Sequence, residues 1–152
     1  MHPFPFTEVE WSRVNQAAAD IVNQGLMDDP VLRDAGVAEM CAILDDLRQR
    51  HGEHPILLET QADFLSDNVE SQSLYRQAIA LAVANGLLTY TARISLANVL
   101  LTEFHDCDAA RLQLIQCEHE LEQNADAQER EQWAELMAQC TGASNKGGRP
   151  QR

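Results

Sequence analysis

Two neighbouring segments of this chain read as copies of one helical hairpin, and this repeat limits the fold more than any other feature of the sequence. The first copy spans residues 55–86 and the second spans residues 88–124. Within each copy, apolar residues recur at helical spacing in two stretches, one on either side of a short polar break. Ala62, Ala97 and Ala134 occupy matching positions, at offsets of 35 and 37 residues. A period of this length is typical of stacked two-helix units.

Start and stop signals extend the helical prediction to most of the chain. Thr7 and Glu10 fit a capping box that begins a helix over residues 8–25. Asp29 before Pro30 predicts a second helix that runs to residue 51, and Gly36 is the point at which we expect this helix to weaken. The first hairpin copy supplies two helices that end near residues 65 and 84. Three more helices are expected over residues 89–104, 109–123 and 126–140.

These signals predict an all-α fold of about seven helices, stacked as antiparallel hairpins in a single domain over residues 1–140. A chain of 152 residues is long enough for one domain with an adequate core. In this interpretation residues 7–52 form an N-terminal helical pair and residues 55–140 form the repeats. Residues 141–152 are polar and contain glycine, so we expect a disordered tail there.

Residues 55–140 resemble tetratricopeptide repeats. Each repeat of that family has a small residue in the middle of its first helix, where the second helix crosses closely, and Ala62, Ala97 and Ala134 match this position. The large apolar positions on either side are matched by Leu58, Leu65, Leu96 and Leu100. The sequence departs from the family pattern at Arg93, in a shorter loop in the first copy, in the missing proline at the repeat end, and over residues 7–52. The resemblance implies a short superhelix whose concave groove binds another protein.

The resemblance also implies which side chains point into the groove, namely those one position after the small residue and those three positions before it. In this sequence these residues are Glu59, Asp63, Ile94, Asn98, Glu131 and Glu135. Four of the six are carboxylates, so such a groove would accept Lys or Arg side chains from a partner. The alternative is that these carboxylates form a solvated helix face with no partner.

The charge of the chain limits the classes of partner. The formal net charge is −13, although Lys146, Arg149 and Arg152 lie close to the C-terminal end. Without these three residues, positions 1–145 carry 8 basic and 24 acidic side chains, a net charge of −16. Such a field repels nucleic acids and anionic membranes and attracts proteins with a basic patch. The alternative is that the acidic surface serves only solubility.

Cysteine usage and the N-terminal sequence indicate a cytoplasmic protein. The four cysteines include no C-x-x-C pair, and the first residues lack the basic and apolar regions of a secretory signal. The longest nearly apolar stretch, residues 78–88, is far shorter than the roughly 20 residues that a membrane helix requires. We therefore expect a reduced protein without a membrane span.

A zinc site is the strongest competing prediction for this chain. His105, Cys107, Cys117 and His119 are ligand types that zinc prefers. However, Cys117 and His119 are two residues apart, and on a helix this spacing turns their side chains about 200° from each other. We therefore predict no metal and no other cofactor.

The sequence does not indicate an enzyme. The His51-Gly52-Glu53-His54 segment lacks the spacing of a helical zinc-protease motif, and there is no glycine-rich phosphate loop or serine nucleophile elbow. Cys107 next to His105 has acidic neighbours, which disfavour a nucleophilic thiolate.

Three functions fit a small acidic helical-repeat protein without catalytic residues. The first, which we favour, is a bacterial immunity protein that binds and neutralises a toxin with a basic surface. The second is a secretion chaperone or adaptor that holds a secreted substrate in its groove. The third is a scaffold with no inhibitory role.

Overall fold

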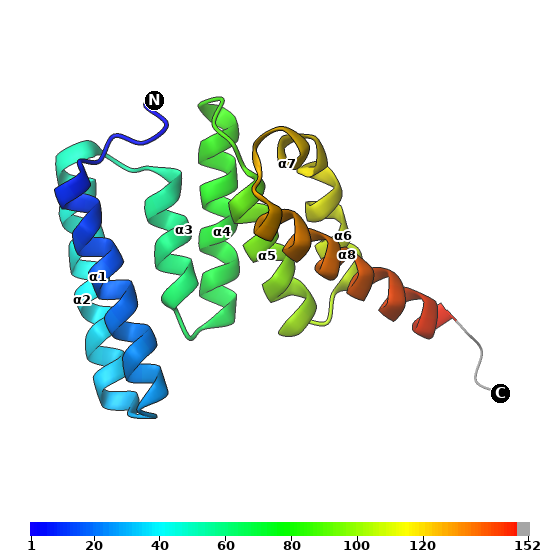
Figure 1. Ribbon diagram of the computed structural model, residues 1–152, viewed down its shortest axis with the longest axis horizontal. Helices are drawn as coiled ribbons and strands as arrows, with labels where there is room; N and C mark the ends of the chain where they lie inside the picture. Colours follow the sequence, from blue (N-terminus) through cyan, green and yellow to red (C-terminus); the bar gives the residue numbers. More distant parts are fainter. Residues whose placement is uncertain (149–152) are drawn as a thin grey trace.

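The computed structural model describes residues 1–148, apart from the side chains of Leu26 and of residues 143–148. Over this range the chain forms eight helices and no strand (Figure 1). Their bounds are α1 (Glu8–Leu26), α2 (Pro30–His51), α3 (Pro55–Phe64), α4 (Asn68–Ala84), α5 (Tyr90–Thr102), α6 (Cys107–Gln116), α7 (Glu118–Asn124) and α8 (Ala127–Gly148). The predicted all-α fold is confirmed. No helix within residues 1–148 combines the length and the apolar character needed to cross a bilayer.

The helices pack as sequential pairs, as the repeat predicted. α1 packs against α2, α3 against α4, and α5 against α6, while α2–α3 and α4–α5 contacts join successive pairs. Figure 1 shows these hairpins following one another along the long axis of the molecule, with α1 and α2 at one end. α8 packs on α6 and α5 at the other end of the stack.

Local signals fix the first hairpin. Thr7 Oγ1 accepts a hydrogen bond from the Glu10 backbone N–H at 3.1 Å, and the Glu10 carboxylate accepts one from the Thr7 backbone N–H at 2.9 Å, which confirms the capping box. Asp29 caps α2 as predicted. Gly36 does not split α2, which is continuous from Pro30 to His51. Instead it permits a close approach of α1, because a Cβ at this position would lie 3.1 Å from Cγ1 of Ile21.

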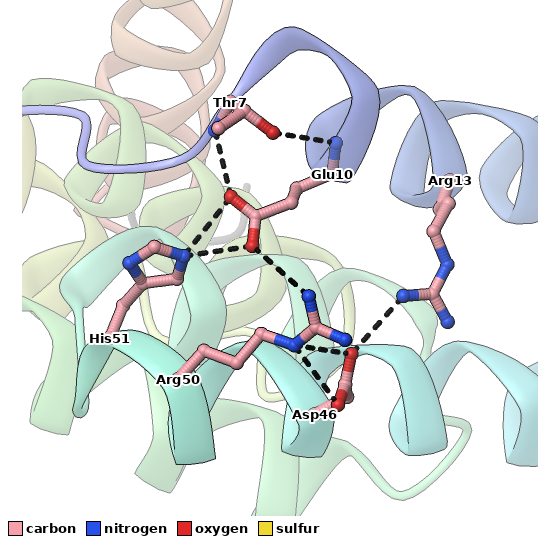
Figure 2. Close-up of polar contacts among 6 residues, drawn as sticks. All are labelled: Thr7, Glu10, Arg13, Asp46, Arg50 and His51. Atoms are coloured by element: carbon pink, nitrogen blue, oxygen red, sulfur yellow. Dashed lines mark hydrogen bonds and ion pairs between the residues drawn. The ribbon is translucent and has the colours of Figure 1, made fainter.

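A polar network, which we call the α1–α2 clasp, joins the start of α1 to the end of α2 (Figure 2). The Glu10 carboxylate oxygens lie 2.9 and 3.0 Å from Nε2 of His51. Arg50 adds a longer ion pair with Glu10 at 3.9 Å and a second with Asp46 at 3.3 Å. Asp46 also pairs with Arg13 of α1 at 3.1 Å. The Arg50–Asp46 pair lies within α2, whereas the other three contacts join α1 to α2 of the same hairpin, so we interpret the clasp as structural.

α3 is shared between two hydrophobic cores. Leu57 packs into the core formed with α1 and α2, which includes Phe6 and Leu44. The next residue, Leu58, packs into the second core, which extends through the later helices to Cys140 of α8. Adjacent residues of a helix point about 100° apart, so α3 faces both cores at once. The N-terminal pair is therefore packed continuously against the repeats.

The predicted helix over residues 109–123 is two helices, α6 and α7, that meet at Cys117. In an unbroken helix the Leu114 carbonyl would accept a hydrogen bond from the backbone N–H of residue 118. Here it accepts instead from Nε1–H of Trp133 in α8, at 2.8 Å, and from the Cys117 thiol at 3.4 Å. The segment contains neither glycine nor proline, so the sequence gives no local signal for this break.

α8 is longer than the last helix that we predicted. It continues to Gly148 rather than ending at residue 140, so the expected disordered tail is helical as far as that residue. Residues 127–148 contain no proline, and the backbone hydrogen bonds can therefore continue through the segment. The rest of the expected tail, residues 149–152, lies outside the described residues.

The register of α8 also differs from the prediction. Ala62 and Ala97 are buried, with 2% and 0% of their surface exposed, as expected for close helix crossings. Ala134 is exposed and makes no such crossing, so its alignment with the other two is wrong. α8 packs instead through Trp133, Leu136, Met137 and Cys140.

Candidate partner-binding face

α3 and α5 bring acidic and polar side chains together on one face of the molecule. Glu59 and Asp63 are four residues apart on α3, and this spacing directs them to the same side of the helix. The hydroxyl of Thr91, in the first turn of α5, donates a hydrogen bond to Oε2 of Glu59 at 3.1 Å. Asn98 is exposed and lies seven residues after Thr91, which places it on the same side of α5. We call these four residues the acidic face.

A buried tyrosine holds the Asp63 carboxylate in place by a hydrogen bond. Tyr75 of α4 is 4% exposed, and its hydroxyl donates a hydrogen bond to Oδ1 of Asp63. Burial raises the pKa of Tyr75 far above its ordinary value, with a further contribution from Asp63. The phenol therefore stays neutral and keeps its donor, which fixes the position of the Asp63 carboxylate.

α8 adds a third carboxylate next to the acidic face. Oε1 of Glu129 accepts hydrogen bonds from the Tyr90 hydroxyl at 3.3 Å and from the Asp126 backbone N–H at 3.0 Å. The charge of Glu129 also contributes to the raised pKa of Glu59. Negative charge from α3 and α8 thus gathers around the first turn of α5.

The carboxyl groups of the acidic face are poorly hydrated for surface groups. Burial is the main reason that the pKa of Glu59 is raised to about 7. The charge of Asp63 also raises this pKa, and the hydrogen bond from Thr91 lowers it by a smaller amount. Burial also raises the pKa of Asp63. Glu59 is nevertheless only half-buried and Asp63 is exposed. Protein atoms therefore surround both carboxyl groups closely enough to disfavour their charged forms.

A cavity of about 190 Å³ opens where the acidic face meets the start of α3. Glu59 and Thr91 line it with polar atoms. Its apolar wall is formed by Pro3, Pro55, Ile56, Leu87 and Leu88.

His54 also lines the cavity, and its hydrogen bonds identify its protonation state. Its Nδ1 accepts from the Ile56 backbone N–H at 3.2 Å, so this nitrogen carries no proton. Its Nε2 lies 3.0 Å from the His2 carbonyl oxygen and donates to it. The imidazole is therefore neutral in this arrangement, in agreement with a pKa that burial lowers.

The structure brings together only half of the residues predicted for the groove. Glu59, Asp63 and Asn98 lie on the acidic face. Ile94 is 4% exposed and belongs to the second core, so the prediction that it faces a groove is wrong. Its place is taken by Thr91, one turn earlier on α5.

Glu131 and Glu135 are exposed on α8, but they do not face α5. The residues that pack α8 against α5 and α6 cluster around Trp133 and Leu136. At 100° per residue, Glu131 and Glu135 point to the opposite side of the helix. Their predicted place in the groove followed from the alignment of Ala134, which the register of α8 contradicts.

Four residues at or beside the acidic face were missed from the sequence: Tyr75, Tyr90, Thr91 and Glu129. For Glu129 a signal was present, because it lies four residues before Trp133 and forms a capping box with Asp126. For Tyr75, Tyr90 and Thr91 the sequence contained no such signal, because their roles depend on hydrogen bonds to other helices.

The residues considered as zinc ligands are not grouped. Cys117 is fully buried at the α6–α7 junction, whereas His119 is exposed on α7. Within the part of the chain that the structure describes, no three His, Cys, Asp or Glu side chains lie close enough to hold a metal ion. That the protein binds no metal in solution stays a prediction.

Comparisons of the chain with protein-family models, with curated proteins and with solved structures find no match.

Proposed function

We propose that this protein binds a partner protein with a basic patch through its acidic face. The observation that carries the proposal is the joint position of Glu59 and Asp63, held by Thr91 and Tyr75, with Glu59 lining a cavity. Carboxylates that are fixed and partly dehydrated form stronger hydrogen bonds with Lys or Arg than solvated ones do. The tetratricopeptide-like stacking of hairpins fits this proposal, since such stacks use one face for binding.

We further propose that the protein acts as an immunity protein that neutralises a toxin with a basic surface. A net charge of −13 suits the inhibition of toxins whose substrate-binding clefts are cationic, because opposite charge speeds the encounter. A secretion chaperone or adaptor is the alternative, because the same face would hold a basic segment of a secreted substrate. A scaffold without inhibitory activity is the third.

Capture of the partner separates these functions. The full chain, immobilised and incubated with native lysate, should retain one protein that the Glu59→Gln/Asp63→Asn variant retains poorly. A Glu131→Gln/Glu135→Gln variant is the matched control, because it also replaces two carboxyl groups by amides, on the outer side of α8. A toxic domain whose growth inhibition is relieved by co-expression of this protein supports immunity, and a translocated protein without toxicity supports the chaperone. Equal capture by both variants would contradict binding through the acidic face.

A further inference from the structure

We propose that the cavity at the start of α3 binds the side chain of a lysine residue of the partner, with the ammonium group on Glu59 and the methylene chain along the apolar wall. This inference rests on the proposed function and names the group that the acidic face recognises. It follows from the free acceptor, the apolar wall and the charge of the cavity.

Glu59 presents a free acceptor to the cavity. Its Oε2 accepts from the Thr91 hydroxyl at 3.1 Å, while its Oε1 accepts no hydrogen bond from any residue described by the structure. No Arg or His side chain among those residues forms an ion pair with this carboxylate. A partly buried carboxylate without a cationic partner is unfavourable for the folded protein, and an incoming cation would relieve this.

The wall of the cavity suits an aliphatic chain that ends in a charge. Ile56, Leu87 and Leu88 line the cavity together with Glu59, and their side chains are entirely apolar. Leu88 is large and apolar, yet 54% of its surface is exposed. A lysine side chain can cover such a surface with its methylene groups while its charged end reaches a polar partner.

The hydrogen bonding of Glu59 favours an ammonium over a guanidinium group. A guanidinium binds a carboxylate best when both carboxylate oxygens are available for two parallel hydrogen bonds. Thr91 already occupies one of the two oxygens. An ammonium is a compact charge with three donors, so it can bind Oε1 and still donate to the Thr91 hydroxyl oxygen.

The surrounding charges favour a cation. The neutral imidazole of His54 adds no positive charge to the lining. Asp63 and Glu129 add negative charge close to Glu59. A cation in the cavity would therefore interact favourably with three carboxylates, against the repulsion of the single N-terminal ammonium near His54.

Short peptides with blocked ends test the proposal. N-acetyl-Gly-Lys-Gly-amide and its norleucine and arginine counterparts would be titrated into the ¹⁵N-labelled full chain, with the amide signals of Ile56 and Thr91 as readout. We expect the lysine peptide to bind with a Kd on the order of 1–10 mM, at least about fivefold tighter than the norleucine peptide. The arginine peptide should bind with an affinity between those of the lysine and norleucine peptides. In Glu59→Gln the preference for lysine over norleucine should drop to about one, whereas Glu135→Gln should keep it.

Three results would overturn the inference: no saturable shift with the lysine peptide, an equal lysine preference in Glu59→Gln, or tighter binding of arginine. Measuring partner capture by the same variant separates this inference from the proposed function. Reduced capture without any lysine preference would reject the lysine site and leave the acidic face as an interface. A lysine preference with unchanged capture would keep the cavity as an ammonium site and reject its role in the proposed function.

Discussion

Among single residues, Glu59 shows most clearly a placement that opposes stability. Its pKa is about 7 in the folded protein, against 4.5 for an ordinary glutamate, chiefly because it is buried. Between these two values the folded state binds more protons than the unfolded chain, so the free energy of unfolding falls as the pH rises. The loss is complete once the pH has passed about 7. Residues that serve binding are often unfavourable for folding, and Glu59 fits this pattern.

We predict that Glu59→Gln stabilises the protein at pH 8 by about 1–3 kcal/mol, a range that allows for solvent access to the carboxyl group. Near pH 4.5 the difference should vanish, because the wild-type carboxyl group is then protonated in the folded state. Urea unfolding across this pH range would measure the effect. Glu135→Gln serves as the control and should change the stability by no more than about 0.5 kcal/mol at any pH. If the difference in the free energy of unfolding between Glu59→Gln and wild type did not change with pH, this would contradict a raised pKa of Glu59 in the folded protein.

Glu10 contributes the opposite pH dependence of stability, because its pKa is lowered in the folded protein. The Thr7 backbone N–H, followed by His51, lowers the pKa of Glu10 to about 2, so the capping box and the clasp together contribute stability above pH 4.5 that is lost as the pH falls through 2. We predict that Glu10→Gln lowers the urea midpoint at pH 7 and that this difference shrinks toward pH 2. Glu8, in the same first turn but outside the clasp, provides the control. If Glu8→Gln and Glu10→Gln gave the same pH profile, the clasp would not be the cause.

At the scale of elements, the stack depends on close crossings at Ala62 and Ala97. We predict that Ala97→Leu overpacks the crossing of α5 and destabilises the protein by about 1–3 kcal/mol. The same substitution at Ala134, which is exposed on α8, should change the stability by no more than about 0.5 kcal/mol. Thermal unfolding of the two variants compares a buried with an exposed position for one chemical change. Equal melting temperatures would argue against the described packing of α5.

The α6–α7 junction is where zinc binding was considered. Because Cys117 is buried with its thiol on the Leu114 carbonyl, we predict well under one zinc per chain in protein purified without chelator. Elemental analysis measures this directly. Stoichiometric zinc, with unfolding when it is removed, would require a different arrangement of α6 and α7.

The elements that the sequence predicted well are those whose signals are local. Thr7, Glu10 and Asp29 each act within a few residues, and the corresponding helix starts are observed. The α6–α7 break could not be predicted, because its cause is Trp133, nineteen residues after the carbonyl that it occupies. The predicted register of α8 was wrong for the same reason. The register is set by the packing of α8 on α5 and α6, and the spacing of Ala134 from Ala97 in the sequence does not contain this information.

In the candidate site, too, the residues that the sequence predicted depend on local pattern, and those that it missed depend on contacts between helices. Glu59 and Asp63 followed from the resemblance of α3 to the first helix of a repeat, and α3 keeps that register because Ala62 is buried. Tyr75 and Thr91 could not be found, since each acquires its role from a hydrogen bond to another helix. Periodicity identifies the face of a helix, but the partner of each side chain depends on how the helices cross.

For the whole molecule, charge is the property that connects the fold to the proposed function. Its net charge of −13 attracts a basic partner over a distance that depends on ionic strength. The screening length is about 10 Å at 0.1 M salt and about 3 Å at 1 M. Overall charge therefore affects any encounter at low salt, and only contacts within the interface persist at high salt.

The most direct test of the account is the association rate of the captured partner, measured at about 0.05 M and about 1 M salt. At a pH well above the Glu59 pKa of about 7, Glu59→Gln/Asp63→Asn and Glu131→Gln/Glu135→Gln each remove two carboxylates, so the comparison tests where the charge is removed. We predict that the first variant associates about three- to tenfold more slowly than the second at low salt, with a shallower salt dependence, because its charges lie within the interface. If the two variants associated at the same rate and with the same salt dependence, the acidic face would not be the binding surface.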